Sequence, residues 1–182
     1  MRETDKQMNK DMNKKLLSLL ILLFVMAGSA NAQQFVDRLH FEATANTGYK
    51  SKDKTPIDFS FKAGIDVVPR LYVFFTSEEN KTLYKKDDVK TYYDGSSLGG
   101  GLGVKLLDSD KTTQSLDIRA KVLSSVGNPD WKRTTYDASV AWYLSGKQRF
   151  SPVLELGYRY IDSRSNNISN YGSLYVGIGI RY

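Results

Sequence analysis

The stretch from Ser173 to Tyr182 alternates strictly between two sets of side chains, and this alternation constrains the fold more than any other feature. One set is apolar and ends on an aromatic ring: Leu174, Val176, Ile178, Ile180 and Tyr182. The other is mostly small or polar: Ser173, Tyr175, Gly177, Gly179 and Arg181. Successive side chains of a β-strand point to opposite sides, so each set occupies one face. One fully lipophilic face is typical of a transmembrane β-barrel, where lipid solvates the outside and neighbouring strands pair both backbone edges.

The first 32 residues have the order of a secretory signal peptide. A basic segment with Lys10, Lys14 and Lys15 precedes the apolar run 16–26, and the small residues Ala30-Asn31-Ala32 follow. The apolar run is too short to cross roughly 30 Å of hydrocarbon as a helix. We therefore expect cleavage after Ala32, with Met8 or Met12 as alternative starts, and one mature domain over 33–182.

The mature chain repeats the period-two alternation between turn signals, which predicts eight strands. The segments are 38–49, 57–68, 71–78, 96–107, 115–126, 134–144, about 153–160, and 173–182. Segment 71–78 begins with five consecutive apolar residues, so its facing stays open. The predicted fold is an all-β, eight-stranded, antiparallel, up-and-down transmembrane β-barrel.

Connections of two sizes alternate along the chain. Compact turns lie near Pro69, Ser109 and Gly146, and longer polar connections lie at 50–56, 79–95, 127–133 and 162–170. Short periplasmic turns and long extracellular loops are typical of outer-membrane barrels, so both termini are expected in the periplasm. Segment 79–95 is a candidate ligand-binding loop, but a solvated hairpin that continues the third and fourth strands is the favoured interpretation.

The composition of the two faces indicates which one lines the interior. An apolar-lumen soluble barrel would alternate equally well. Here the apolar face carries aromatic residues near its ends, as a membrane-interface girdle does: Tyr49, Tyr136, Trp142, Tyr158, Tyr160 and Tyr182. The other face is rich in Gly and Ser and carries both charge signs: Glu42, Asp58, Asp66, Asp117, Asp137 and Glu155 with Lys62, Lys105, Arg119, Lys121, Arg159 and Arg181. Because buried charges need partners, we expect a charge network across a plugged lumen, with hydroxyls from Thr44, Ser60 and Ser139.

These features together resemble the small outer-membrane barrels of the OmpX and OmpA transmembrane-domain type. The terminal run Leu174, Val176, Ile178, Ile180 and Tyr182 is similar to their C-terminal assembly signal. The resemblance implies a Gram-negative outer membrane, contact with outer-membrane lipid and lipopolysaccharide, and recognition by the barrel-assembly machinery. We also expect a monomer that binds no nucleic acid.

Catalytic and metal-binding motifs are weak in this chain. There is no cysteine, and the single histidine, His40, is expected to join the interior polar network. The run Gly99-Gly100-Gly101-x-Gly103 lacks the Lys-Ser/Thr of a phosphate loop, and Asp108-Ser109-Asp110 lacks the Gly and terminal Glu of a calcium loop. We assign no catalytic, cofactor or metal residue. The expected function is a non-enzymatic structural or surface-interaction role through the extracellular loops, with the ligand of 79–95 unidentified. A small porin-like pore and, less favoured, a lipid-modifying barrel enzyme remain alternatives.

Overall fold

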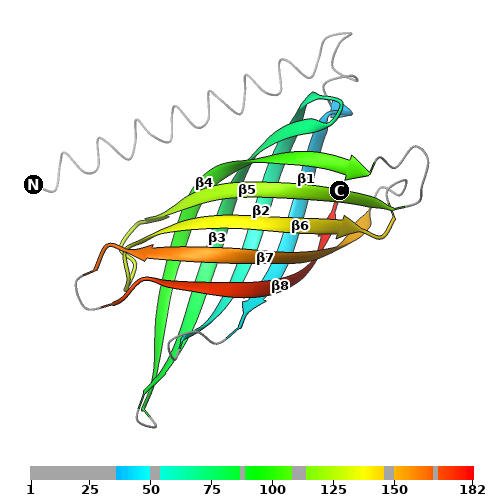
Figure 1. Ribbon diagram of the computed structural model, residues 1–182. Coiled ribbons are helices and arrows are strands. Elements are labelled where there is room, and N and C mark those ends of the chain that lie inside the picture. Colours follow the sequence, from blue (N-terminus) through cyan, green and yellow to red (C-terminus); the bar gives the residue numbers. More distant parts are fainter. Residues whose placement is uncertain (1–35, 50–53, 87–88, 108–113, 146–149, 166–167) are drawn as a thin grey trace, which may run out of the picture. The chain divides into compact units, whose positions relative to one another are not determined.

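A computed structural model describes residues 36–49, 54–86, 89–107, 114–145, 150–165 and 168–182. The predicted signal peptide and its cleavage site lie outside these residues. The barrel occupies residues 40–182, and its eight strands follow one another around it (Figure 1). They are β1 (Leu39–Gly48), β2 (Lys54–Val68), β3 (Leu71–Lys86), β4 (Val89–Leu107), β5 (Ser115–Val126), β6 (Arg133–Tyr143), β7 (Ser151–Ser163) and β8 (Tyr171–Arg181).

The strands form a closed antiparallel barrel in sequence order, which confirms the predicted fold class. Closure comes from the pairing of β1 with β8, in which Ala45 lies opposite Ile178. The backbones of Phe41 and Tyr182 exchange two hydrogen bonds, of 2.9 and 2.7 Å, at the end of this seam. Among the described residues, no helix is long and apolar enough to cross a membrane.

Burial alternates along every strand as the sequence predicts. The apolar face points outward, where Ile178, Leu174 and Leu156 are 66, 60 and 59 % exposed. The polar face points into the lumen, where Glu42, Asp117 and Arg159 are at most 2 % exposed. A largely apolar exterior around a charged interior is the arrangement that a lipid solvent requires.

The structure settles the facing of β3, which the sequence left open. Tyr72 and Phe74 point inward, whereas Val73 and Phe75 are exposed on the outside. The two inward rings lie over Gly103 and Gly101 of β4, where a β-carbon would collide with them. The glycines therefore make room for large aromatic side chains in a narrow barrel.

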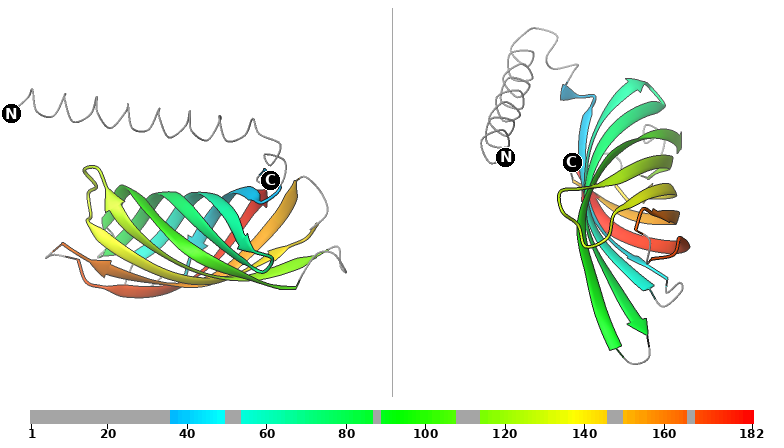
Figure 2. Two further views of the ribbon diagram at one scale, coloured as in Figure 1. Left: turned by 90° about the horizontal axis from the view of Figure 1, so that it is seen from above. Right: turned by 90° about the vertical axis from the view of Figure 1, so that its left-hand side faces the viewer.

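The polar segment 79–95 is mostly paired strand, which corrects its description as a loop and agrees with the favoured hairpin. β3 and β4 stay in register as far as Lys86 opposite Val89. Next to them, β5 ends at Val126, opposite Ser96, so the β3–β4 hairpin extends about 20 Å beyond the end of β5. Figure 2 shows this hairpin projecting past the other strands. We call this side of the barrel the loop end, and the side with the Pro69 turn the turn end.

Candidate functional site

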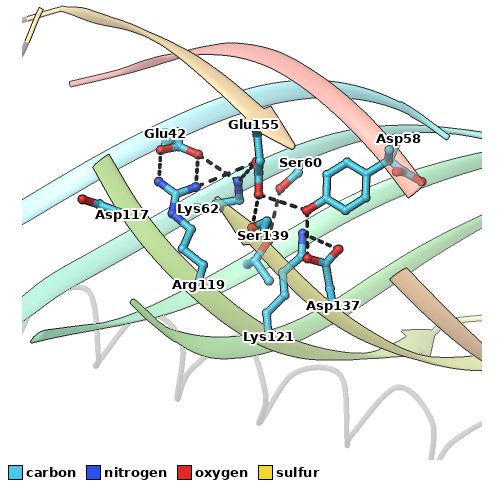
Figure 3. A network of polar contacts seen from close by, with 12 residues as sticks. Glu42, Asp58, Ser60, Lys62, Asp117, Arg119, Lys121, Asp137, Ser139 and Glu155 are labelled. Atoms are coloured by element: carbon cyan, nitrogen blue, oxygen red, sulfur yellow. Dashed lines mark hydrogen bonds and ion pairs between the residues drawn. The ribbon is translucent and has the colours of Figure 1, made fainter. Parts of the chain in front are cut away.

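Two features of the barrel are candidates for function: the charged lumen and the loop end. The middle of the lumen contains two carboxylates bridged by two cations (Figure 3). Arg119 donates from Nη1 and Nη2 to the two oxygens of Glu42, at 2.8 and 2.6 Å. Lys62 donates to Glu42 at 2.8 Å and to Glu155 at 2.6 Å. These side chains come from β1, β2, β5 and β7, so the ion pairs span the lumen.

A second layer, nearer the loop end, is organised around Arg159 of β7. Its guanidinium bonds Asp137 at 3.0 Å, Glu78 at 3.1 Å and Asp58 at short range. Lys121 joins the same layer and lies 3.1 Å from Glu78 and 3.7 Å from Asp137. Arg159 thus neutralises carboxylates from β2, β3 and β6. Removing it would leave several buried charges without their main partner.

Tyrosine hydroxyls complete the hydrogen bonding of these carboxylates. Tyr143 donates to Glu42 at 2.8 Å, and Tyr72 donates to Asp117 at 2.9 Å. Tyr175 lies 2.8 Å from Asp137 and 3.1 Å from Glu155, and so connects the two charged layers. Its ring also lies 4.9 Å from the Arg159 guanidinium. The tyrosine rings therefore fill space in the lumen, while their hydroxyls form hydrogen bonds with its carboxylates.

An aromatic and cationic cluster covers the lumen at the loop end. Trp131, from the β5–β6 connection, stacks on Tyr171 of β8 with ring centroids 5.9 Å apart. Lys54 lies over both rings, and Arg133 lies 5.1 Å from the Trp131 ring. Lys54 also donates to the backbone carbonyl of Ser169 at 3.0 Å. Trp131 is only 3 % exposed, so this cluster caps the lumen rather than offering an open aromatic platform.

His40 lies inside the lumen at the turn end, as expected. Its Nδ1 is 4.0 Å from Asp66, and its ring meets Tyr72 edge-on with centroids 4.8 Å apart. Lys105 donates to the same Asp66 at 2.5 Å. Arg181 lies 3.7 Å from Asp117, so the turn end of the lumen also has both charge signs. Within the described ranges, no group of three or more His, Asp or Glu side chains is placed to hold a metal ion.

The predicted network is present, with specific differences in its membership. Ser139 donates to Glu155 at 2.8 Å as expected, whereas the Ser60 hydroxyl pairs with Thr76 at 3.3 Å. The Thr44 hydroxyl has no hydrogen-bond partner among the described residues, which corrects its predicted role. Glu78 was not predicted because the facing of β3 was open, and Lys54 and Arg133 were expected in the connections 50–56 and 127–133. Lys54 begins β2 and Arg133 begins β6, so both extend those strands beyond their predicted limits.

The projecting hairpin has an open backbone edge on β4. The backbone of Asp94 points toward the β5–β6 connection. Its N–H donates to the Asp130 carboxylate at 3.1 Å, and its carbonyl accepts from the Asp130 N–H at 3.2 Å. Backbone direction alternates along a strand, so Tyr92 and Lys90 direct their N–H and carbonyl groups to the same side. β5 has already ended there, and the structure gives these groups no partner in the part of the chain that it describes.

The fold has counterparts of known structure, although sequence comparison finds none. No protein-family model matches the chain, and no curated protein matches it. The structure of the outer membrane enzyme PagL superposes with a TM-score of 0.51, covering 77 % of this chain and 97 % of that one, at 8 % identity. The chain has the fold of a small outer-membrane β-barrel. The N-terminal β-barrel domain of Pseudomonas aeruginosa OprF (TM-score 0.48, 9 % identity, 79 % and 96 % covered) and Neisserial surface protein A (0.46, 15 %, 79 % and 94 %) are also similar.

Proposed function

We propose that the protein is a non-enzymatic barrel of the bacterial outer membrane that acts at the cell surface through its loop end. The apolar exterior and the outer-membrane barrel fold support the location, together with the signal peptide predicted over residues 1–32. In the proposed orientation the turn end is periplasmic and the projecting β3–β4 hairpin is extracellular.

The content of the lumen favours this role over that of a pore. An eight-stranded barrel has an interior just wide enough for side chains to fill. Here Arg119, Lys62 and Arg159 reach across it to carboxylates on other strands, and the cluster around Trp131 covers the loop end. An ion would have to displace these paired groups in order to pass, so we expect no conduction.

The open edge of β4 carries the proposal of a surface interaction. The free backbone groups of Lys90 and Tyr92 form a template for one additional strand. Tyr92 is 63 % exposed and would contribute side-chain contact beside the new strand. A partner with an extended segment would therefore bind by strand addition to the hairpin, with main-chain hydrogen bonds supplying affinity.

Proline at the open edge tests this mechanism directly. Tyr92→Pro removes an N–H that faces the open side and leaves the bonds between β3 and β4 intact. Tyr92→Ala is the matched control, because it removes the ring and keeps the N–H. The protein in phosphatidylcholine nanodiscs is used to select peptides from a phage-displayed library, with empty nanodiscs as background.

We expect the wild type to enrich extended peptides, the Ala variant to retain a substantial part of their binding, and the Pro variant to lose it. Enrichment no higher than on empty nanodiscs would contradict the surface role. Equal binding by the Pro variant and the wild type would contradict strand addition.

A further inference from the structure

Two shallow grooves formed by described residues lie on the outward surface, and both have small side chains along the floor. The first, of about 530 Å³, crosses β4 to β7 over Gly100, Ala120 and Ala138. The second, of about 680 Å³, crosses β8 and β1 to β3 over Ala43, Ala45 and Ser77. Larger side chains border each groove, including Tyr136, Tyr158 and Tyr160 for the first and Phe59, Phe61 and Ile178 for the second. Each groove can accept a lipid acyl chain.

Arg164 lies at the loop end of the first groove, and Lys132 is its backbone neighbour in the β5–β6 connection. Arg164 Nη2 lies 3.0 Å from the hydroxyls of both Ser124 and Ser125 and 3.1 Å from the carbonyl of Arg133. Ser124 is the next outward position of β5 after Val122, which lines the groove, so the cation lies about 7 Å further toward the loop end. The Arg164 amide donates to the carbonyl of Lys132 at 2.8 Å, so the exposed residue Lys132 lies beside Arg164 along the backbone.

The charge of this pair is open to a ligand. Arg164 is held through Nη2 alone, and no described residue accepts a bond from its Nη1 or Nε. Within the described ranges, no carboxylate lies within 4.0 Å of Arg164 or Lys132. Asp162 accepts from the Asn170 amide and Asp130 from the Asp94 amide. Both acids keep their charge, but neither pairs with Arg164 or Lys132. A guanidinium fixed at one nitrogen presents its remaining edge to a phosphate in a favourable geometry.

The second groove ends differently and serves as an internal comparison. Glu79 lines it at the loop end, where its carboxylate accepts from the Ser96 hydroxyl at 2.8 and 2.9 Å. A lipid phosphate there would meet a negative charge. Acyl chains can therefore occupy either groove, but an anionic headgroup is attracted only by the first.

We propose that the groove over β4 to β7, with Arg164 and Lys132 at its loop end, binds the phosphorylated lipid A moiety of lipopolysaccharide. One acyl chain lies along Gly100, Ala120 and Ala138, and a lipid A phosphate binds the two cations. The choice of lipopolysaccharide rests on the orientation proposed above, because the loop end then lies in the outer leaflet.

Native mass spectrometry of the folded barrel in detergent tests this site with three probes: bisphosphorylated lipid A, dephosphorylated lipid A with the same acyl chains, and phosphatidylglycerol. We expect the wild type to bind bisphosphorylated lipid A about tenfold more tightly than the dephosphorylated form. The double variant Arg164→Ala/Lys132→Ala should lose this preference. Ala138→Leu, which fills the groove floor, should weaken the binding of both forms of lipid A.

Control variants separate the site from general charge effects. Lys81→Ala/Lys90→Ala removes the same charge from the hairpin, and Glu79→Ala alters the second groove; both should keep the wild-type preference. Equal binding of the two lipid A forms, or an unchanged preference in Arg164→Ala/Lys132→Ala, would overturn the site. Tighter binding of phosphatidylglycerol than of lipid A would overturn the assignment to lipopolysaccharide. Tyr92→Pro should bind lipid A normally, so this proposal and the surface role fail separately.

Discussion

At the scale of single residues, Arg159 is the cation on which the lumen depends most. It is 2 % exposed and contacts Asp58, Glu78 and Asp137. Arg159→Leu should lower the free energy of unfolding by about 3–5 kcal/mol, because it leaves buried carboxylates unpaired. Lys81→Leu is the control: Lys81 pairs with Asp94 on the exposed hairpin, and such pairs contribute about 1 kcal/mol or less. Urea unfolding in lipid vesicles gives both values, and equal losses would contradict a buried network.

Gly157 tests the packing of rings against glycines. A β-carbon at this position would meet the Tyr175 ring, whose hydroxyl bonds Asp137 and Glu155. Gly157→Val should destabilise the barrel by about 1–3 kcal/mol through overpacking. In a Tyr175→Ala background the same change should cost much less, because the obstructing ring is gone. Additive losses in this double-mutant cycle would show that the two positions do not interact.

Individual network members could be predicted from the sequence only where a strand alternates clearly. Glu42, Arg119 and Glu155 occupy polar positions of well-patterned strands, and all three are in the network. The membership of Glu78 in the network was not predicted, because both faces of β3 begin with apolar side chains. Its facing depends on Gly101 and Gly103 of the next strand, which leave room for Phe74 and Tyr72. That information is carried by the cross-strand register and is absent from β3 itself.

At the scale of the strand, the cost of a charge at an outward position should depend on how far that position lies from the loop end. Ile178 faces outward among apolar side chains, so Ile178→Arg should destabilise by about 2–4 kcal/mol if it lies near the middle of the lipid layer. Thr134→Arg is the matched control, because Thr134 faces outward near the loop end and should cost about 0–1 kcal/mol. Urea unfolding in lipid vesicles measures both losses, and equal losses would contradict contact between lipid and Ile178.

Closure of the barrel should depend on Tyr182. Its backbone exchanges two hydrogen bonds with Phe41, and its ring packs 5.3 Å from that of Phe150. We predict that deleting Tyr182 lowers the amount of heat-modifiable, protease-resistant barrel in the membrane, through loss of this closure and of the proposed assembly signal. Tyr182→Phe keeps the ring and the backbone and should assemble normally. Unchanged levels after the deletion would count against both roles.

Strand ends were predicted less well than strand faces, for a physical reason. The apolar pattern is required only where lipid touches the outside. Beyond Glu79 and Ser96 the outward positions are solvated, so the pattern fades while the β3–β4 ladder continues to Lys86 and Val89. The end of the alternating pattern therefore indicates where the strand leaves the lipid-covered part of the exterior. It does not indicate where the strand itself ends.

At the scale of the whole molecule, strand number and lumen content were predictable because lipid outside and paired charges inside impose strict patterns. The proposed interaction surface could not be predicted from the sequence, because the open edge near Tyr92 depends on where the neighbouring strand β5 ends. The groove ending at Arg164 likewise depends on a residue that crosses β6 to reach Ser124. Both features arise between strands, where no single segment carries a signal.

Paired charged side chains fill the lumen and should block the passage of ions, and single-channel recording tests this most directly. The purified wild type, inserted in a planar bilayer with a larger porin as positive control, should give no reproducible current steps. Refolding is verified first by the heat-modifiable shift in electrophoretic mobility. Stable, ion-selective steps from the folded wild type would contradict the account and make the small pore the leading function.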